Sequence, residues 1–387
     1  MLKITDIKIF VVGNPWKNWI FIRILTDEGI DGLGECTGGL ETKSHEAFVT
    51  ELKSRVIGKN PLNITGLMDF LRKTLFLNSG GCAVSGIEAA CWDITGKVCR
   101  KPLYQLLGGK AREKIRVYAN GWYQGPRTPE GFAEKAKEMV KKGYTALKFD
   151  PFGKAYKYMS VEDENLSIRI VEAVRKAVGE TVDILIEAHD RFSISQAVRI
   201  AGRLEEYRPF WFETPVLSDN FEAVCEVARR VRIPVIAGER TSQPRELAKL
   251  LAKGVLDLVN PEYLGCGGIG GLMDCFALAR GFDAFVAPHN AQSPYSTAVN
   301  VHVGITQPNL IIQECFDDAS VEGAGRALSG YPKQKDGFIE PADTPGIGVS
   351  FNEEIAAQYP YGDKNFLWMF DDGWERRGGA KSMEASG

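Results

Sequence analysis

The stretch Ile184-Leu185-Ile186-Glu187 is an apolar run that ends in a carboxylate, and the same pattern returns in Phe210-Trp211-Phe212-Glu213 and in Ile236-Ala237-Gly238-Glu239. The three glutamates follow one another at equal intervals of 26 residues (213 − 187 and 239 − 213). This interval is close to the roughly 30 residues that one β-strand and its following α-helix occupy in a barrel. The pattern therefore predicts three neighbouring parallel strands whose carboxyl ends carry the same acidic group.

Further apolar runs, separated by amphipathic helical patterns, continue the alternation on both sides of these three. Eight strand–helix repeats favour a (β/α)₈ TIM barrel over an open doubly wound sheet. No G-x-G-x-x-G motif follows an early strand, which further disfavours the open sheet. We expect the barrel domain to span residues 115–340, with strands at Val117–Asn120, Ala146–Phe149, Ile184–Glu187, Trp211–Glu213, Val235–Ala237, Leu256–Val259, Ala284–Ala287 and Ile311–Glu314.

The residues before the barrel have a different pattern. Two β-rich runs, 2–12 and 19–26, and the short run 32–35 predict an antiparallel meander. From Val84 to Val98 the apolar residues recur every three or four positions, as on one face of a helix. We therefore expect an N-terminal α+β domain over residues 1–114, with the tail 341–387 packing back on it.

Composition excludes several classes of function. The chain has 387 residues, of which 44% are hydrophobic and 25% charged, as is typical of a globular protein. A net charge of −3 without long runs of one sign argues against a nucleic-acid binder. No apolar run is long enough to cross a membrane, and the first residues are typical of a strand rather than a signal peptide. The eight scattered cysteines lack a CxxC pair, which favours reduced thiols and a cytoplasmic protein.

The three strand-end glutamates form a candidate metal site. Barrel enzymes carry their reactive groups at the carboxyl ends of the strands, so Glu187, Glu213 and Glu239 are expected in one mouth. Three carboxylates so close together raise one another's pKa unless a cation neutralises them. Oxygen ligands suit Mg²⁺, and the chain has no Cys or His cluster at zinc spacing. A single strand-end glutamate could simply face solvent or pair with an arginine, but three at equal spacing favour Mg²⁺.

Two of the four histidines follow strand ends. His189 lies two residues after Glu187, and His289 follows the seventh expected strand. Imidazole is the usual proton shuttle near neutral pH, so both are candidate acid–base groups. We expect His45, in a helix-start pattern, and His302, in an apolar helical stretch, to be structural.

This combination resembles the enolase superfamily, in its mandelate racemase-like branch, and within it the acid-sugar dehydratases. The glutamates, the run Gly267-Gly268-Ile269, the strand-seven His and Glu314 at strand eight carry the resemblance. Cys91-Trp92-Asp93-Ile94 is similar to a helix of the family's N-terminal capping domain, and residues 118–124 and 147–153 look most like gluconate dehydratases, with galactonate dehydratases as close relatives. The resemblance covers nearly the whole chain and implies an enolase-like modified barrel with an N-terminal α+β capping domain.

The resemblance also implies a role for each residue. Mg²⁺ would lie on the three glutamates, although the first ligand is usually an aspartate. His289 would remove the proton α to the substrate carboxylate, oriented by Glu262 at a place where relatives usually carry aspartate. His189 would protonate the departing 3-hydroxyl group, and Glu314 would hydrogen-bond the substrate carboxylate. The product would be a 2-keto-3-deoxy acid.

Candidate substrate contacts are less specific. Lys148 matches the first lysine of the racemases' Lys-x-Lys pair, but Asp150 takes the second place, which disfavours a two-base racemase of that pattern. In the loop 13–18, which would close the site, Lys17 reads equally well as a solvated lysine. The candidates are Lys148, Asp150, Arg191, Asn290, Trp16 and Lys17.

The leading hypothesis is a Mg²⁺-dependent dehydratase of a small acid sugar, gluconate or galactonate, which the resemblance predicts to be a homo-oligomer. An epimerase or cycloisomerase of the same fold is second, because the two strand-end histidines could act as opposed bases. A non-catalytic barrel used for binding is third. An NAD enzyme and a phosphate-binding barrel are weaker, because no Gly-rich phosphate loop is evident.

Overall fold

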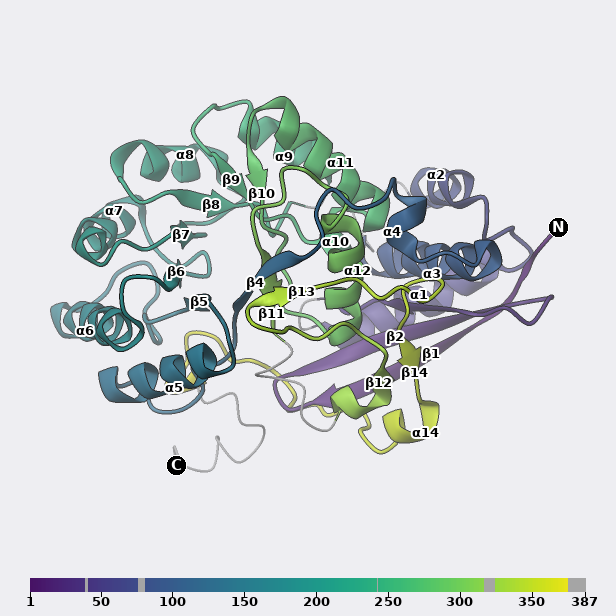
Figure 1. The fold of residues 1–387 in the computed structure, drawn as a ribbon, viewed down its shortest axis with the longest axis horizontal. Helices are drawn as coiled ribbons and strands as arrows, with labels where there is room; N and C mark the ends of the chain where they lie inside the picture. The colour runs from purple at the N-terminus through teal and green to yellow at the C-terminus, as the bar shows by residue number, and fades with distance from the viewer. Residues whose placement is uncertain (39–40, 76–80, 242, 317–323, 375–387) are drawn as a thin grey trace.

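A computed structural model describes residues 1–38, 41–75, 81–241, 243–316 and 324–374. The chain opens with a three-stranded antiparallel sheet in the order β1-β2-β3 (Figure 1). Strands β1 and β2 pair as far as Asn14 opposite Lys17, so their hairpin turns on Pro15 and Trp16 alone, a shorter loop than the predicted 13–18. The strands are β1 (Ile4–Asn14), β2 (Lys17–Thr26) and β3 (Gly32–Glu35).

Helices cover one face of this sheet, and glycines let the longest of them approach. A Cβ on Gly34 would lie 2.2 Å from the carbonyl oxygen of Gly86, and one on Gly32 would lie 2.1 Å from that of Ala90. Strand β3 and α3 therefore touch backbone to backbone, which side chains at these positions would prevent. The helices of this domain are α1 (Thr42–Val56), α2 (Ile64–Leu75), α3 (Gly81–Cys99) and α4 (Leu103–Leu106).

Eight parallel strands then form the barrel, in the order β10-β9-β8-β7-β6-β5-β4-β11. The ring closes just before β11, where Leu310 bridges to Val286 and the amide of Ile311 donates to the Val286 carbonyl (3.0 Å). The strands are β4 (Ile115–Ala119), β5 (Ala146–Phe149), β6 (Asp183–Glu187), β7 (Trp211–Glu213), β8 (Val235–Ala237), β9 (Leu258–Val259), β10 (Phe285–Val286) and β11 (Gln313–Cys315). The predicted barrel is confirmed, and three of the eight strands have the predicted bounds; the others differ by one or two residues at one or both ends.

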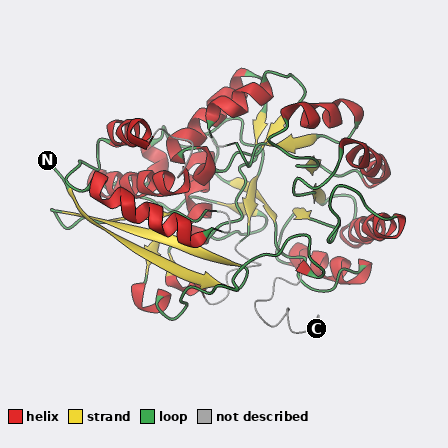
Figure 2. Cartoon of the chain, turned by 180° about the vertical axis from the view of Figure 1, so that it is seen from behind, coloured by secondary structure: helices red, strands yellow, loops and turns green. Residues whose placement is uncertain are grey.

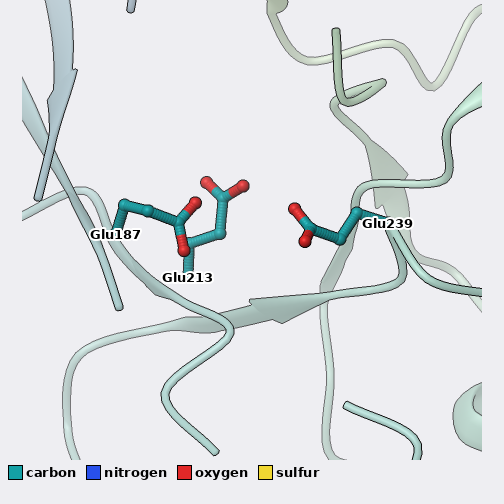
Figure 3. A group of neighbouring side chains, drawn as sticks. All are labelled: Glu187, Glu213 and Glu239. Carbon is teal, nitrogen blue, oxygen red and sulfur yellow. The ribbon is translucent and has the colours of Figure 1, made fainter. Parts of the chain in front are cut away.

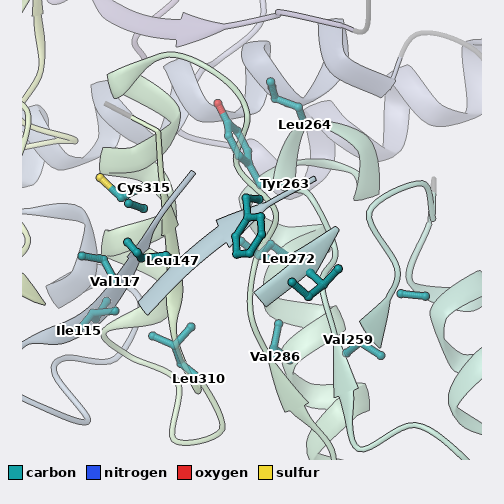
Figure 4. Packing of buried hydrophobic residues seen from close by; sticks show 14 of the residues in the cluster. Ile115, Val117, Leu147, Val259, Tyr263, Leu264, Leu272, Val286, Leu310 and Cys315 are labelled. Carbon is teal, nitrogen blue, oxygen red and sulfur yellow. The ribbon is translucent and has the colours of Figure 1, made fainter. Parts of the chain in front are cut away.

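Helices follow strands β4 to β10 and surround the barrel (Figure 2). Figure 4 shows the layer between strands and helices, where Leu147 and Val259 pack in the same buried cluster as Leu272 of α11. The helices are α5 (Pro129–Lys141), α6 (Val161–Val178), α7 (Ile194–Leu204), η1 (Glu205–Tyr207), α8 (Phe221–Arg230), α9 (Pro244–Leu251), α10 (Tyr263–Cys266), α11 (Gly268–Gly281) and α12 (Pro294–Gly304). Among the described residues no helix is long and apolar enough to cross a membrane.

The described part of the tail returns to the N-terminal sheet. The ring of Phe351 lies 5.1 Å from those of Phe10 and Phe21, and the Arg23 guanidinium donates to the Phe351 carbonyl (2.8 Å). Residues 375–387 of the predicted tail lie outside the described residues. The remaining elements are η2 (Ala324–Ala327), β12 (Leu328–Ser329), β13 (Phe338–Ile339), β14 (Ser350–Phe351) and α14 (Glu353–Ala356).

A buried carboxylate joins the two domains near the barrel mouth. Glu35, at the end of β3, accepts hydrogen bonds from the hydroxyl of Ser296 (2.7 Å) and from the hydroxyl and amide of Ser293. Burial raises the pKa of Glu35, while these hydroxyl donors oppose the shift. The contact ties the capping sheet to the start of α12, just after the loop that carries His289.

Candidate active site

The barrel interior places the polar residues of the site. Its inner core takes one residue from each strand or its immediate flank: Tyr118, Ala146, Leu185, Trp211, Ile236, Leu258, Ala287 and Ile312. Because side chains alternate along a strand, the residue two positions further along points to the same face. In seven of the eight strands that residue is polar, and together they form the floor of the mouth: Asn120, Lys148, Glu187, Glu213, Asn260, His289 and Glu314.

Strand β8 is the exception, and a glycine explains it. Two positions after Ile236 lies Gly238, whose φ of +140° is a conformation that residues with side chains rarely adopt. A Cβ there would also lie 3.2 Å from the amide nitrogen of Asn260. The acidic side chain therefore comes one residue later, from Glu239, and it is the most exposed of the three strand-end glutamates.

The three glutamates converge as the sequence predicted (Figure 3). Carboxylate oxygens of Glu187, Glu213 and Glu239 all lie within 4.8 Å of one another. Burial and the neighbouring charge of Glu187 raise the pKa of Glu213 well above its ordinary value. The three carboxylates are hard oxygen donors, and a positive charge between them would relieve their mutual repulsion. Such a set of donors suits a divalent cation. These residues fit a metal site, and the metal would be a hard divalent ion.

Lys148 supplies part of the compensating charge. Its Nζ lies 2.7 Å from Glu213, 2.9 Å from Glu314 and 3.3 Å from Glu187. Burial opposes a charge on this lysine, but the carboxylates, led by Glu213, raise its pKa well above the ordinary value. The ammonium group is almost inaccessible to solvent, although Lys148 also lines the cavity above it.

His289 belongs to a chain of contacts that reaches the capping domain. Its Nδ1 lies 3.2 Å from Oε2 of Glu262, and Oε1 of Glu262 accepts a hydrogen bond from Gln292. The side-chain oxygen of Gln292 in turn accepts from Lys17 Nζ (2.7 Å). Burial lowers the pKa of His289, but the nearby Glu239 and other carboxylates outweigh burial and raise it to about 10. A cation among the same carboxylates would offset that effect.

His189 has its own carboxylate partner. Its Nδ1 lies 2.6 Å from Oδ2 of Asp150, and the guanidinium of Arg191 pairs with the same oxygen. Asp150 and Arg191 are completely buried, and neither is among the described residues that line the cavity. Both were predicted to contact substrate; the structure places them behind His189 instead.

Glu314 and Asn290 form a further buried pair. The backbone amide of Asn290 donates to Oε2 of Glu314 (2.6 Å), and the side-chain amide of Asn120 donates to Oε1 (2.6 Å). Asn290, another predicted substrate contact, is buried beside Thr297, to whose hydroxyl it donates (2.8 Å). Asn290 therefore holds Glu314 in place, and its side chain is not part of the cavity wall in the described residues.

A cavity of about 420 Å³ lies above this floor. Trp16 and Lys17 of the β1–β2 hairpin, both candidate substrate contacts, line it, and Trp16 packs on Phe316 with ring centroids 5.1 Å apart. No local pattern in the sequence marks the residues that complete its wall: Thr37, Gly38, Glu41, Cys82, Asn120, Arg240, Gly265, Ala291, Gln292, Phe316, Leu367 and Met369.

Comparison with known families agrees with this geometry. Residues 7–108 match the N-terminal domain of mandelate racemase and muconate lactonizing enzyme, and residues 131–355 match the family described as enolase C-terminal domain-like. The chain belongs to the mandelate racemase/muconate lactonizing enzyme family. The predicted membership and fold class are therefore confirmed.

Members of this family with dehydratase names are similar over most of the chain. A D-gluconate dehydratase of Thermoproteus tenax is 36% identical over 372 residues, which cover 93% of this chain and 74% of the relative. A D-gluconate/D-galactonate dehydratase of Picrophilus torridus is 31% identical and covers 93% of this chain and 95% of the relative. A mandelate racemase/muconate lactonizing enzyme structure from Sulfitobacter sp. is 31% identical, with a TM-score of 0.89 over 96% of this chain and 99% of that one.

Proposed function

We propose that this family member is a Mg²⁺-dependent dehydratase of an acid sugar, with gluconate or galactonate as the favoured substrate. One observation carries the proposal: two histidines, each paired with its own carboxylate, line one cavity together with Glu239 of the predicted metal site. They follow β6 and β10, which are four strands apart in a ring of eight and therefore face each other across the mouth. The names of the relatives support the same reaction.

The two histidines would divide the proton transfers. His289 takes the proton from the carbon α to the substrate carboxylate, and Glu262 holds its Nδ1. The electron pair left by that C–H bond first moves toward the substrate carboxylate as an enolate, which can take a proton back at the α-carbon. The same pair then forms the α,β double bond when the 3-hydroxyl leaves. His189 gives that oxygen a proton, so it departs as water. The resulting enol tautomerises to a 2-keto-3-deoxy acid.

The remaining residues would bind and orient. When bound by Glu187, Glu213 and Glu239, Mg²⁺ would supply the positive charge that the substrate carboxylate needs as negative charge develops on it. Glu314 would contribute to binding of the same carboxylate indirectly, because it holds hydrogen-bond donors in place, above all Lys148. Trp16 and Lys17 meet the far end of the sugar chain, because the hairpin forms that part of the wall.

The facing histidines also favour one alternative, an epimerase in which both act as bases on opposite faces of the α-carbon. The product separates the two, because dehydration removes one oxygen from the substrate and epimerisation removes none. A non-catalytic binding protein, the third reading, has no need of two histidine–carboxylate pairs beside a metal site.

The test is to incubate the protein with Mg²⁺ and a panel of aldonic and aldaric acids and to assay 2-keto-3-deoxy product. We expect turnover of one or two aldonates that is lost with EDTA, in His289→Asn and in Glu239→Gln. The exposed Glu113→Gln is the matched control and should keep full activity. An epimer as the only product would favour the alternative. If no acid gives either product or α-proton exchange in D₂O, that result would refute an enzymatic function.

Two broader proposals accompany this function. The first is a cytoplasmic location, which the predicted reduced thiols support. The resemblance to the acid-sugar dehydratases makes a homo-oligomer the expected assembly, which sedimentation would test.

A further inference from the structure

The partner of His189 has no role in the reaction as proposed. Asp150 is not among the described residues that line the cavity, yet its carboxylate lies 2.6 Å from the ring of His189. We propose that Asp150 is a positioning residue: it holds the Nδ1–H of His189 and so commits Nε2 to the leaving hydroxyl. This inference rests on the proposed function, since it names the group that prepares its general acid.

The hydrogen bonds of Asp150 determine which nitrogen of His189 carries the proton. An ionised carboxylate only accepts hydrogen bonds, so a contact of 2.6 Å with Nδ1 requires that Nδ1 donate. The other oxygen, Oδ1, accepts from the amide of Phe152 (2.8 Å). The Nε2 of His189 is then the ring nitrogen that remains for a ligand in the cavity.

The surrounding residues fix Asp150 in turn. Arg191 pairs with it from a completely buried position, and the same guanidinium donates to the carbonyls of Ala188 (2.9 Å) and Gly153 (2.6 Å). Arg191 is therefore bound to both loops that carry the pair, one after β5 and one after β6. Its side chain sets the distance between Asp150 and His189.

The backbone at His189 supports a positioning role. His189 and Asp190 have φ values of +49° and +60°, in the left-handed region that residues with side chains rarely adopt. The backbone amide of Asp190 donates to the carbonyl of Thr214 (2.8 Å), and the Asp190 carboxylate accepts from the amide of Ser218 (3.0 Å). These two hydrogen bonds hold the loop in this conformation. Strain of this kind persists where the surrounding contacts over-determine a side-chain position.

The second histidine provides a matched comparison within the same protein. His289 is paired with Glu262 as His189 is with Asp150, but His289 acts on the α-proton and His189 on the leaving group. Weakening the Asp150–His189 pair should therefore slow only the loss of the hydroxyl group. Weakening the Glu262–His289 pair should slow removal of the α-proton and, with it, the whole reaction.

The experiment measures two rates in D₂O with the aldonate that the wild type dehydrates: exchange of the α-proton and formation of the keto product. In Asp150→Asn we expect product formation to fall about 100-fold, within the range that a general acid contributes, while exchange falls less than about fivefold. In Glu262→Gln both rates should fall by the same factor. Equal losses of both rates in Asp150→Asn, in a protein with wild-type thermal stability, would overturn the inference.

A double variant tests whether Asp150 acts through His189. If it does, His189→Asn with Asp150→Asn should form product no more slowly than His189→Asn alone. A second loss that multiplies the first would show an independent role and would overturn the proposal.

A measurement on the wild type needs neither substrate nor a stable variant. The chain has only four histidines, so ¹⁵N-histidine NMR, with His189→Asn for assignment, reports the protonation of each ring nitrogen. We expect a proton on Nδ1 of His189; a bare Nδ1 would overturn the inference. If no acid sugar reacts at all, the proposed function fails, while this measurement still shows whether Asp150 holds the proton on Nδ1 of His189.

Discussion

A buried histidine outside the cavity makes acid stability a measurable consequence of the fold. His302 lies in α12, and its Nδ1 accepts from the amide of Tyr104 (3.3 Å) while its Nε2 faces the carbonyl of Ile347 (3.1 Å). This pair of contacts fits the neutral ring, and burial lowers the pKa of His302 to about 4. His302 thereby joins α12 to α4 and to the tail, the structural role predicted from the sequence.

The sign and size of the effect follow from linkage. The unfolded chain binds a proton on this histidine below about pH 6.5, whereas the folded protein does so only near pH 4. The contribution to stability is therefore fully present above pH 6.5 and is lost as the pH falls toward 4. The complete loss is about 3 kcal/mol, of which about 2 kcal/mol is lost between pH 7.5 and pH 5.0.

The assay compares His302→Gln with the wild type by urea unfolding at both pH values. At pH 7.5 we expect the variant to be less stable by about 2 kcal/mol, for two weakened hydrogen bonds. At pH 5.0 the two proteins should be nearly equal, because only the wild type has lost the histidine's contribution. Asn309→Ala, another buried polar change but without a titrating group, should cost the same at both pH values. A difference for His302→Gln that does not change with pH would refute the reasoning.

Three other predictions test separate parts of the structure. Lys148→Met should lower the free energy of unfolding of the metal-free protein by about 3–5 kcal/mol, because it leaves the buried carboxylates around it unpaired; urea unfolding measures this. Gly346→Ala should lower the free energy of unfolding by at least about 3 kcal/mol, since φ is +79° and the new Cβ would lie 2.2 Å from Oδ1 of Asp93. Its control is Gly29→Ala, at φ +76° with open space around it, which should lower that free energy by only about 1–2 kcal/mol. Trp16→Ala should raise KM about tenfold and change kcat little, because it removes cavity wall and no proton-transferring group; an unchanged KM would contradict the assigned wall.

Much of the site could be predicted from strand ends alone. The apolar runs marked the strands, and the equal spacing placed Glu187, Glu213 and Glu239 together because parallel strands share one carboxyl edge. The alternation that puts one residue of each strand in the inner core also leads to Asn120 and Asn260, which the sequence analysis did not single out. That rule needs the register of the core, which the sequence does not show directly.

The rest depended on contacts that have no local signal. Asp150 and Arg191 follow strands as the other polar residues do, but both are buried. The left-handed backbone at His189 and Asp190 precedes Arg191, and Asp150 is buried in contact with His189 and Arg191. Leu367 and Met369 reach the cavity only because the tail returns across the hairpin. Neither a loop conformation nor the path of a returning tail follows from hydrophobic periodicity.

The origin of the cavity walls bears on how such an enzyme changes over evolutionary time. The groups assigned to proton transfer lie on barrel strand ends, whereas Trp16, Leu367 and Met369 come from the hairpin and the tail. A mutation at one of these three positions alters the shape offered to a sugar chain and replaces neither the histidines nor the carboxylates paired with them. Single substitutions can therefore change the substrate preference while the enzyme stays active. Substrate specificity can evolve in the hairpin and the tail while the catalytic residues on the barrel stay the same.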